Sequence, residues 1–203
     1  MLNKKPELKV YGNDINPYLI EMFKALNKGW TPPLNMTKEE WLYIKQNKDE
    51  YPYLTAFAGY GCSYGGNWFC SYANTSGRNY CREAYKSIMN DIGELNRINW
   101  CCYDYKQFPL PEDPCLIYCD IPYKGTENSR YCLNNHIEFN YDEFWSWADN
   151  TAAKGHTVIV SEYYGNIRTT KYAYNIIWSK DSKAGLRGNK DRSVNTIEVL
   201  VKV

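Results

Sequence analysis

Apolar side chains recur at helical spacing in four stretches of the chain, and each stretch predicts an amphipathic helix. The predicted helices cover residues 16–29, 37–48, 79–95 and 140–153. The sequence Thr37-Lys-Glu-Glu40 is a capping-box pattern at the start of the second helix. Gly29 and Gly155 stand at the ends of the first and last helices, where glycine commonly stops a helix.

Short alternating or β-branched runs predict six strands between and after these helices. They cover residues 8–11, 98–103, 115–119, 156–162, 175–178 and 196–203. The apolar run 115–119 is expected to be a buried strand, and the run 156–162 is typical of a strand covered on both faces. The polar stretch 180–192 predicts a loop or a long hairpin tip. Because strands alternate with helices, we expect an α/β fold with a doubly wound, mostly parallel sheet.

Composition places the chain among ordinary globular proteins. It has 203 residues, of which 44% are hydrophobic and 23% charged, and this excludes wholesale disorder. The net charge of +1 gives no general attraction to nucleic acid, so any DNA contact must come from a local patch. The chain has 20 Tyr, 7 Trp and 6 Phe, which can stack on bases, although AT-rich coding explains the same composition. It shows no signal-peptide core and no apolar run long enough to span a membrane, so we expect a soluble, cytoplasmic protein with reduced cysteines.

One spacing of metal-binding residue types needs to be considered. Cys115 and Cys119 are followed by Cys132 and His136, which is a plausible zinc spacing. If residues 115–119 form a strand, however, the first two thiols lie about 13 Å apart, too far to share one zinc ion. We therefore expect no metal site.

Acidic residues follow three of the predicted strands. Asp14, Asp104 and Asp120 each come directly after a strand, and in parallel sheets ligands bind beyond the carboxyl ends of the strands. Asp120 opens the tetrad Asp120-Ile121-Pro122-Tyr123. A carboxylate, a restrained backbone and an aromatic ring can together receive a planar amino-heterocycle. The simpler interpretation is an aspartate that caps a turn at the end of the strand.

The tetrad resembles the Asp-Pro-Pro-Tyr motif of the Dam-type DNA adenine-N6 methyltransferases. The match extends in order over nearly the whole chain, through Tyr11-Gly-Asn-Asp-Ile-Asn16, Gly61-Cys-Ser-Tyr-Gly-Gly-Asn-Trp-Phe69, Cys102-Tyr-Asp-Tyr105, Phe139-Asn-Tyr-Asp-Glu-Phe-Trp145 and Gly155-His-Thr-Val-Ile-Val-Ser-Glu-Tyr163. The resemblance implies a Rossmann-like methyltransferase domain over residues 1–203. It also implies a helical insertion over residues 37–97 that recognises the DNA target, in a bacterial or phage-infected cell and possibly beside a restriction enzyme.

The resemblance assigns roles to specific residues. It implies methyl transfer from S-adenosylmethionine to the N6 amine of a flipped adenine in double-stranded DNA, without a metal. The catalytic residues would be Asp120, Ile121, Pro122 and Tyr123. The cofactor would be held by Asp14, Ile15, Asp104, Tyr105 and Asp120. The DNA would be contacted by Tyr64, Asn67, Trp68, Arg78, Asn79 and Lys124.

Two of these assignments have simpler alternatives. The aromatic residues of the 53–82 region could instead form the core of a small helical subdomain. The basic residues of the predicted loop could track phosphates or could simply be solvated; they are Lys180, Lys183, Arg187, Lys190 and Arg192.

The chain departs from the family pattern at two points. Ile121 replaces the usual Pro, which keeps the backbone carbonyl but leaves the loop less rigid. The family's first strand and its Phe-x-Gly-x-Gly cofactor loop have no counterpart, and the glycines of 59–66 do not follow a predicted strand. We therefore expect weak or no S-adenosylmethionine binding by the chain alone.

Several interpretations of the missing segment are open. The strands before Asp14 and Asp120 could pair directly, a companion N-terminal polypeptide could complete the sheet, or the reading frame could be incomplete; a truncated or split gene is favoured. The main alternative function is a cofactor-deficient DNA-binding remnant or one half of a split methyltransferase. Cytosine-N4 methylation is a close chemical relative, and methylation of RNA or a small molecule is a weaker option. Cytosine-C5 methylation, which requires a cysteine thiolate to attack the ring, is disfavoured.

Overall fold

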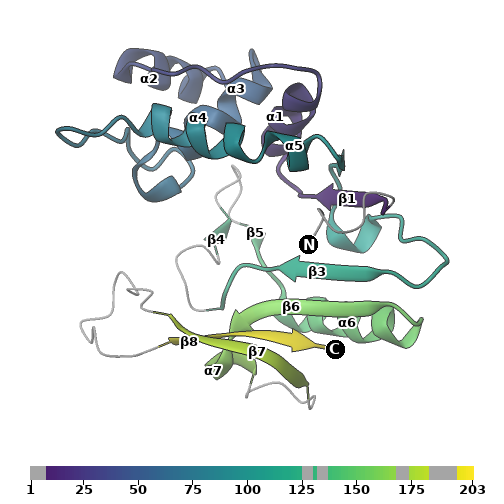
Figure 1. Ribbon diagram of the computed structural model, residues 1–203. Coiled ribbons are helices and arrows are strands. Elements are labelled where there is room, and N and C mark those ends of the chain that lie inside the picture. Colours follow the sequence, from purple (N-terminus) through teal and green to yellow (C-terminus); the bar gives the residue numbers. More distant parts are fainter. Residues whose placement is uncertain (1–7, 125–129, 132–136, 168–173, 183–195) are drawn as a thin grey trace. The chain divides into compact units, whose positions relative to one another are not determined.

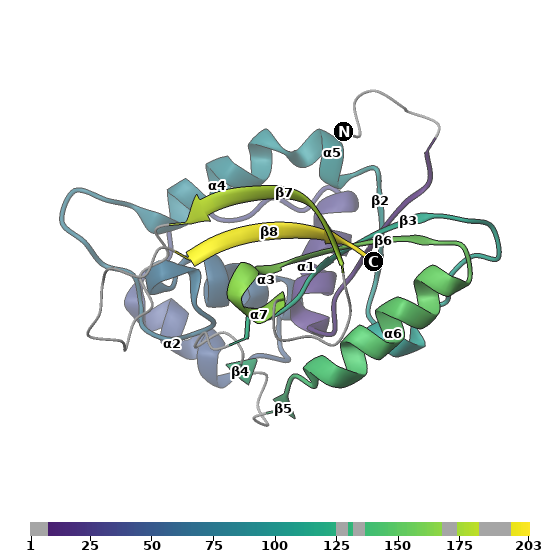
Figure 2. The same cartoon turned by 90° about the horizontal axis from the view of Figure 1, so that it is seen from below.

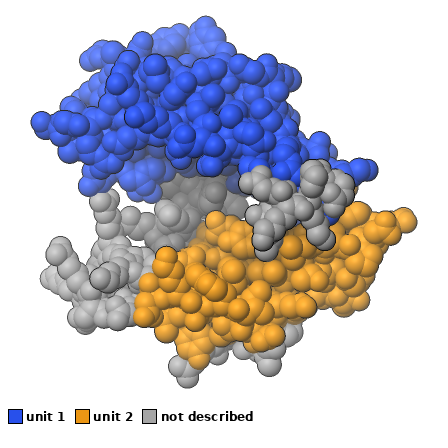
Figure 3. All heavy atoms as spheres, in the orientation of Figure 1, with its two compact units in different colours: residues 1–108 blue, residues 109–203 orange. Residues whose placement is uncertain are grey.

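The computed structural model describes residues 8–124, 130–131, 137–167, 174–182 and 196–203, and these form a mixed α/β structure (Figures 1 and 2). The chain divides into two compact units, Met1–Phe108 and Pro109–Val203, coloured blue and orange in Figure 3. No helix among the described residues combines the length and the apolar character needed to cross a membrane.

The first unit is mainly helical. Its helical elements are α1 (Pro17–Asn27), α2 (Lys38–Gln46), α3 (Pro52–Ala56), the π-helix η2 (Phe57–Gly61), the 3-10 turn η3 (Tyr64–Gly66), α4 (Tyr80–Asn90), α5 (Ile92–Leu95) and the 3-10 turn η4 (Tyr105–Gln107). The side chain of Asn16 caps α1 by accepting from the N–H of Tyr18 at 3.0 Å. Thr37 and Glu40 form the expected capping box at α2. The predicted helix 79–95 is broken at Asp91, whose φ of −102° and ψ of 4° separate α4 from α5.

Trp41 lies in the hydrophobic core of this unit. Its indole Nε1 donates to the carbonyl oxygen of Ala58 at 3.1 Å and to Oγ of Ser63 at 3.2 Å. Gly59 lies so close to the ring of Trp68 that a Cβ there would come within 2.6 Å of it. A Cβ at Gly61 would likewise lie 2.8 Å from Cβ of Ala84. Close packing therefore accounts for these two glycines, which lie in a helix rather than in a loop after a strand.

A two-stranded parallel sheet completes the first unit. Strand β1 (Val10–Asn13) pairs with β2 (Ile98–Cys101), with Val10 opposite Ile98. The Asn13 side chain joins the two carboxyl ends, because it accepts from the N–H of Tyr103 at 2.9 Å and donates to the Tyr103 carbonyl at 3.0 Å.

The second unit is built on a four-stranded mixed sheet with the order β3-β6-β8-β7. Its elements are β3 (Leu116–Asp120), β4 (Arg130–Tyr131), β5 (Ile137–Glu138), α6 (Tyr141–Ala153), β6 (Thr157–Tyr163), α7 (Tyr164–Ile167), β7 (Asn175–Ser182) and β8 (Thr196–Lys202). Helix α6 runs along β6 (Figures 1 and 2), and Val158 and Val160 of that strand are fully buried. The short strands β4 and β5 form a separate antiparallel pair.

The expectation of a mostly parallel sheet is wrong for this unit. Only β3 and β6 run parallel, whereas β8 is antiparallel to both β6 and β7. The physical reason is that β7 and β8, which follow each other in the chain, pair antiparallel, and antiparallel pairing does not require the crossover connection of a parallel pair. The strands before Asp14 and Asp120, β1 and β3, lie in different units.

The expectation that residues 115–119 form a buried strand is also wrong. Strand β3 lies at one edge of its sheet, and Leu116 and Tyr118 are 58% and 59% exposed. The alternate side chains, Ile117 and Cys119, are half-buried on the other face. An apolar run of this length does not distinguish a central strand from an edge strand.

Candidate functional site

The tetrad predicted to receive a base lies at the carboxyl end of β3. Asp120 is the last residue of the strand, where it faces Ser161 of β6 across the parallel pair. Its side chain is exposed, yet nearby protein and then the negative charge of Glu198 raise the pKa of the carboxyl. Ile121 turns inward and is 7% exposed. The carboxyl group of Asp120 thus lies at the edge of the sheet, directly before a residue, Ile121, that is buried in the core.

Tyr123 is fixed at its hydroxyl. The oxygen contacts Oγ of Ser161 and donates to Oε1 of Glu198 at 3.0 Å. Burial, reinforced by the hydrogen bond to Glu198, raises the pKa of the phenol, so it stays protonated at neutral pH. Its ring stands edge-on to the ring of Tyr163, with centroids 4.6 Å apart.

The backbone just after the tetrad is fixed by Glu162. The N–H of Lys124 donates to Oε2 of Glu162 at 3.2 Å. Asn166 bridges the two residues, because its Nδ2 donates to Oε1 of Glu162 and to the Lys124 carbonyl, both at 3.0 Å. Glu162 is 1% exposed, and burial raises the pKa of its carboxyl despite these donors.

The first unit carries the other two acidic residues at the carboxyl edge of its parallel pair. Asp14 accepts from the N–H of Asn16 at 2.7 Å, and burial raises its pKa. Asp104 accepts from the N–H of Lys106 at 3.0 Å and so caps η4. Ile15 is 49% exposed beside Asp14, and Tyr105 is half-buried. Since Asn13 holds Tyr103, Asp14 and Asp104 share one edge, while Asp120 belongs to the second unit.

The predicted DNA-reading aromatics occupy different environments. Tyr64 is 43% exposed in η3. Trp68 packs within the helical unit: its ring is stacked on that of Tyr18 with centroids 5.8 Å apart, and tilted against that of Tyr60 with centroids 4.8 Å apart. Trp68 is therefore part of a packed aromatic cluster, as the subdomain-core alternative expects.

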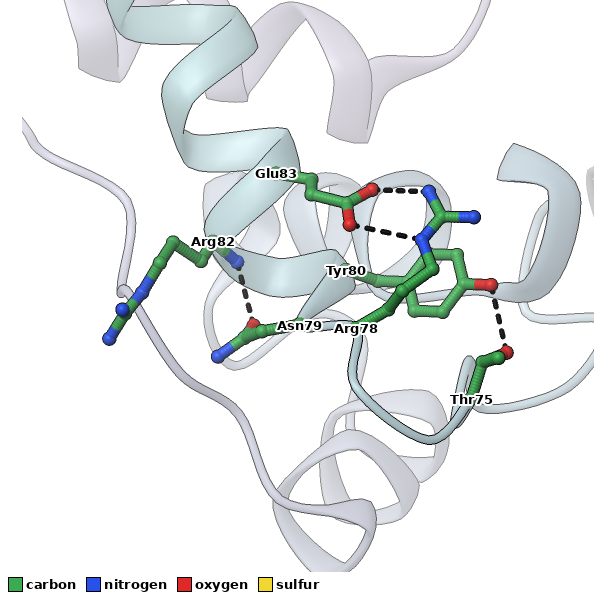
Figure 4. Close-up of polar contacts among 6 residues, drawn as sticks. All are labelled: Thr75, Arg78, Asn79, Tyr80, Arg82 and Glu83. Atoms are coloured by element: carbon green, nitrogen blue, oxygen red, sulfur yellow. Dashed lines mark hydrogen bonds and ion pairs between the residues drawn. The ribbon is translucent and has the colours of Figure 1, made fainter.

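Two of the polar candidates, Arg78 and Asn79, lie just before the first residue of α4 (Figure 4). Arg78 pairs with Glu83, its Nε lying 3.1 Å from Oε1, and its guanidinium lies over the ring of Tyr80. Asn79 caps the helix by accepting from the N–H of Arg82 at 2.8 Å. The Arg82 side chain points away from the Arg78–Glu83 pair. Arg78 and Asn79 are exposed, and Asn67 is half-buried.

Two further candidates lie in the second unit. Lys124 is exposed, with its ammonium 5.7 Å from the ring centroid of Tyr141. Lys180 is exposed in β7. The other basic residues of the predicted loop lie outside the described residues; they are Lys183, Arg187, Lys190 and Arg192.

Sequence reasoning missed the residues that hold the tetrad. Ser161, Glu162 and Glu198 were not singled out, and neither was Asn166. A signal was present, because Ser161 and Glu162 are polar residues at the end of an apolar strand, and Glu198 interrupts another. A polar residue in a buried strand needs a hydrogen-bond partner, and here the partners include Tyr123 and Lys124 in the loop after β3.

The described residues contain no group of three or more His, Cys, Asp or Glu side chains that could hold a metal ion. Cys115 instead contacts His156, whose Nδ1 accepts from the Cys115 N–H at 3.3 Å. Cys132 and His136 lie outside the described residues. No family model matches the chain, and no curated protein matches it.

Proposed function

We propose that this protein is a DNA adenine-N6 methyltransferase that uses S-adenosylmethionine, with a Rossmann-like methyltransferase fold. The observation that supports this most directly is the state of Asp120. Among the described residues, its carboxylate accepts no hydrogen bond and forms no ion pair. Its neighbours in the tetrad are anchored at Ile121 and Tyr123. A fixed loop that presents an unused acceptor is suited to bind an exocyclic amine.

The residues in the first unit fit a nucleoside by their chemistry. Asp14 engages one carboxylate oxygen with the N–H of Asn16, which leaves the other able to accept from ribose hydroxyls. The exposed side chain of Ile15 offers an apolar contact for a purine ring. Asp104 uses one oxygen to cap η4, so its second oxygen is available to an adenine amine. Asp14, Ile15, Asp104 and Tyr105 are accordingly the residues that would hold S-adenosylmethionine.

The protein's own residues would act mainly by orientation. Asp120 and the Ile121 carbonyl would each accept one hydrogen bond from the adenine amine. These two bonds would point the nitrogen lone pair toward the methyl group of the donor. Tyr123 would stack against the flipped base, and its hydroxyl contacts hold the ring in place. When bound, S-adenosylmethionine supplies a reactive sulfonium methyl group. The raised pKa of Asp120 makes its carboxylate a better acceptor for the proton that the amine nitrogen must release once it carries the methyl group.

The first test compares Asp120→Ala with Asp113→Ala, which removes an exposed carboxyl before β3. Tritiated donor at saturating concentration is incubated with unmethylated genomic DNA, and the nucleosides are separated. Because the donor is saturating, even weak donor binding by the chain alone should give N6-methyladenine from the wild type and from Asp113→Ala. The rate for Asp120→Ala should be at least about 100-fold lower, since the amine loses its oriented acceptor. DNA binding without any labelled adenine would contradict the proposed function and indicate a binding protein.

A further inference from the structure

Two consecutive residues of β6 form hydrogen bonds to two consecutive residues of the loop after β3, Tyr123 and Lys124. Ser161 and Glu162 lie next to each other at the end of the strand, so their side chains leave opposite faces of the sheet. Ser161 contacts the hydroxyl of Tyr123, and Glu162 accepts from the N–H of Lys124. Side chains from both faces of β6 therefore form hydrogen bonds to this loop, at the last residue of the tetrad and at the residue after it.

We infer that Glu162 is a positioning residue, which fixes the loop carrying Asp120 and Tyr123 by accepting the Lys124 N–H. This inference rests on the proposed function for its catalytic consequence, but its structural content can be tested without it. Glu162 itself is 1% exposed and does not reach solvent, so its role acts through Lys124.

Three donors converge on this carboxylate. Oε2 accepts from the Lys124 N–H at 3.2 Å, and Oε1 accepts from the Tyr163 N–H at 2.7 Å and from Asn166 at 3.0 Å. Only an ionised carboxylate offers acceptors alone on both oxygens. The site therefore selects Glu over Gln, although both have the same shape.

The position of Glu162 in the strand is unusual for a purely structural residue. Val158 and Val160 occupy the same face and are fully buried, so an apolar residue at 162 would continue the core. A buried carboxylate is costly to desolvate, and it is retained only where polar partners need it. The partner outside β6 and α7 is the loop residue Lys124, reached directly and through Asn166.

The substitution Glu162→Gln distinguishes the hydrogen bond to Lys124 from the hydrogen bonds to Tyr163 and Asn166. The amide nitrogen of Gln is best placed at the oxygen that meets one donor, because the other oxygen meets two. The variant then keeps its bonds to Tyr163 and Asn166 and loses the bond to Lys124. A matched control is Glu112→Gln, which changes an exposed acid in the same unit.

Hydrogen exchange tests the positioning role directly. In Glu162→Gln the amide of Lys124 should exchange at least about tenfold faster, while the amides of β6 remain protected. Uniformly faster exchange through β6 would overturn the inference in favour of a structural role, and so would an unchanged Lys124 amide. If this variant does not fold, Asn166→Ala removes the bridge at a half-buried site and should produce the same local change.

Kinetics then separate the inference from the proposed function. With an active wild type, Glu162→Gln should lower kcat about 10- to 100-fold and leave KM for the methyl donor unchanged, because only the amine acceptor loses its orientation. A variant with wild-type kcat overturns the inference and leaves the proposed function standing. An inactive wild type overturns the proposed function, and the exchange measurement still decides whether Glu162 fixes the loop.

Discussion

At the residue scale, three carboxyl groups with raised pKa values differ in their exposure and in their hydrogen-bond donors. Burial raises the pKa of Asp14, Asp120 and Glu162 alike. Glu162 is compensated by three donors, and Asp14 has one backbone donor. Asp120 has none among the described residues. Asp120, which lacks a hydrogen-bond donor in the described part of the chain, is the acid that the proposed chemistry needs. Polar groups without a partner are expected at a functional site.

The hydroxyl of Tyr123 provides a test of the loop anchor. Tyr123→Phe removes the hydroxyl that contacts Ser161 and Glu198 and leaves these two residues with their mutual hydrogen bond of 3.5 Å, so the second unit should lose about 1–2 kcal/mol of unfolding free energy. Urea unfolding monitored by circular dichroism measures this loss. The control Tyr11→Phe removes a hydroxyl from a side chain that is 57% exposed and should change stability by less than about 0.5 kcal/mol. Equal stability of both variants would show that the anchor contributes nothing.

At the element scale, local signals predicted helix starts better than packing partners. Asn16 and the Thr37–Glu40 capping box mark α1 and α2, because a cap is satisfied within four residues of sequence. The break at Asp91 and the exposure of β3 were not predicted. The exposure of β3 follows from its place at the edge of the sheet, which depends on strands distant in sequence. The same holds for Trp68, whose cluster with Tyr18 is set by tertiary packing.

The candidate site was predictable to a similar extent. Asp14 directly follows β1, Asp104 comes three residues after the end of β2, and Asp120 is the last residue of β3, so each lies at or shortly after the carboxyl end of a strand. The residues that hold the tetrad come from β6 and β8, which are remote in sequence from residues 120–124. The register of β3, β6 and β8 in the sheet brings these residues next to the tetrad.

The π-helix η2 depends on its glycines for packing. In Gly59→Ala the new Cβ meets the rings of Trp68 and Phe69 at 2.6 and 2.8 Å, so we expect a loss of about 1–3 kcal/mol or more. Gly93→Ala is the matched control, because nothing lies within 4 Å of the new Cβ in α5. It should be neutral or stabilise the unit by up to about 1 kcal/mol. Thermal unfolding compares the two, and a neutral Gly59→Ala would refute the packing role.

For the whole molecule, the three raised carboxyl pKa values act in the same direction on stability. The folded state holds these protons more tightly than the unfolded chain, whose groups titrate near 3.8 for Asp and 4.5 for Glu. Their contribution to the unfolding free energy is therefore largest at low pH and falls as pH rises through the raised values. Both units contain such a group, so both respond in the same sense.

The substitution Asp14→Asn tests this linkage. The amide keeps an acceptor for the Asn16 N–H and removes the group that titrates. We expect the variant to gain stability relative to the wild type as pH rises from about 4 to 7. Urea midpoints measured across this range, with Asp113→Asn as the exposed control, check the sign. A difference that is constant with pH would contradict the raised pKa of Asp14.

The order β3-β6-β8-β7 also determines when the second unit can form during synthesis. Strands β3 and β6 can pair as soon as both have left the ribosome, but β7 reaches β6 only through β8, which is made later. Until residues 196–202 emerge, the edge of β6 stays open to other chains. A nascent chain stalled before residue 196 is therefore the species most prone to aggregate, and rare codons just upstream of this strand would prolong its exposure.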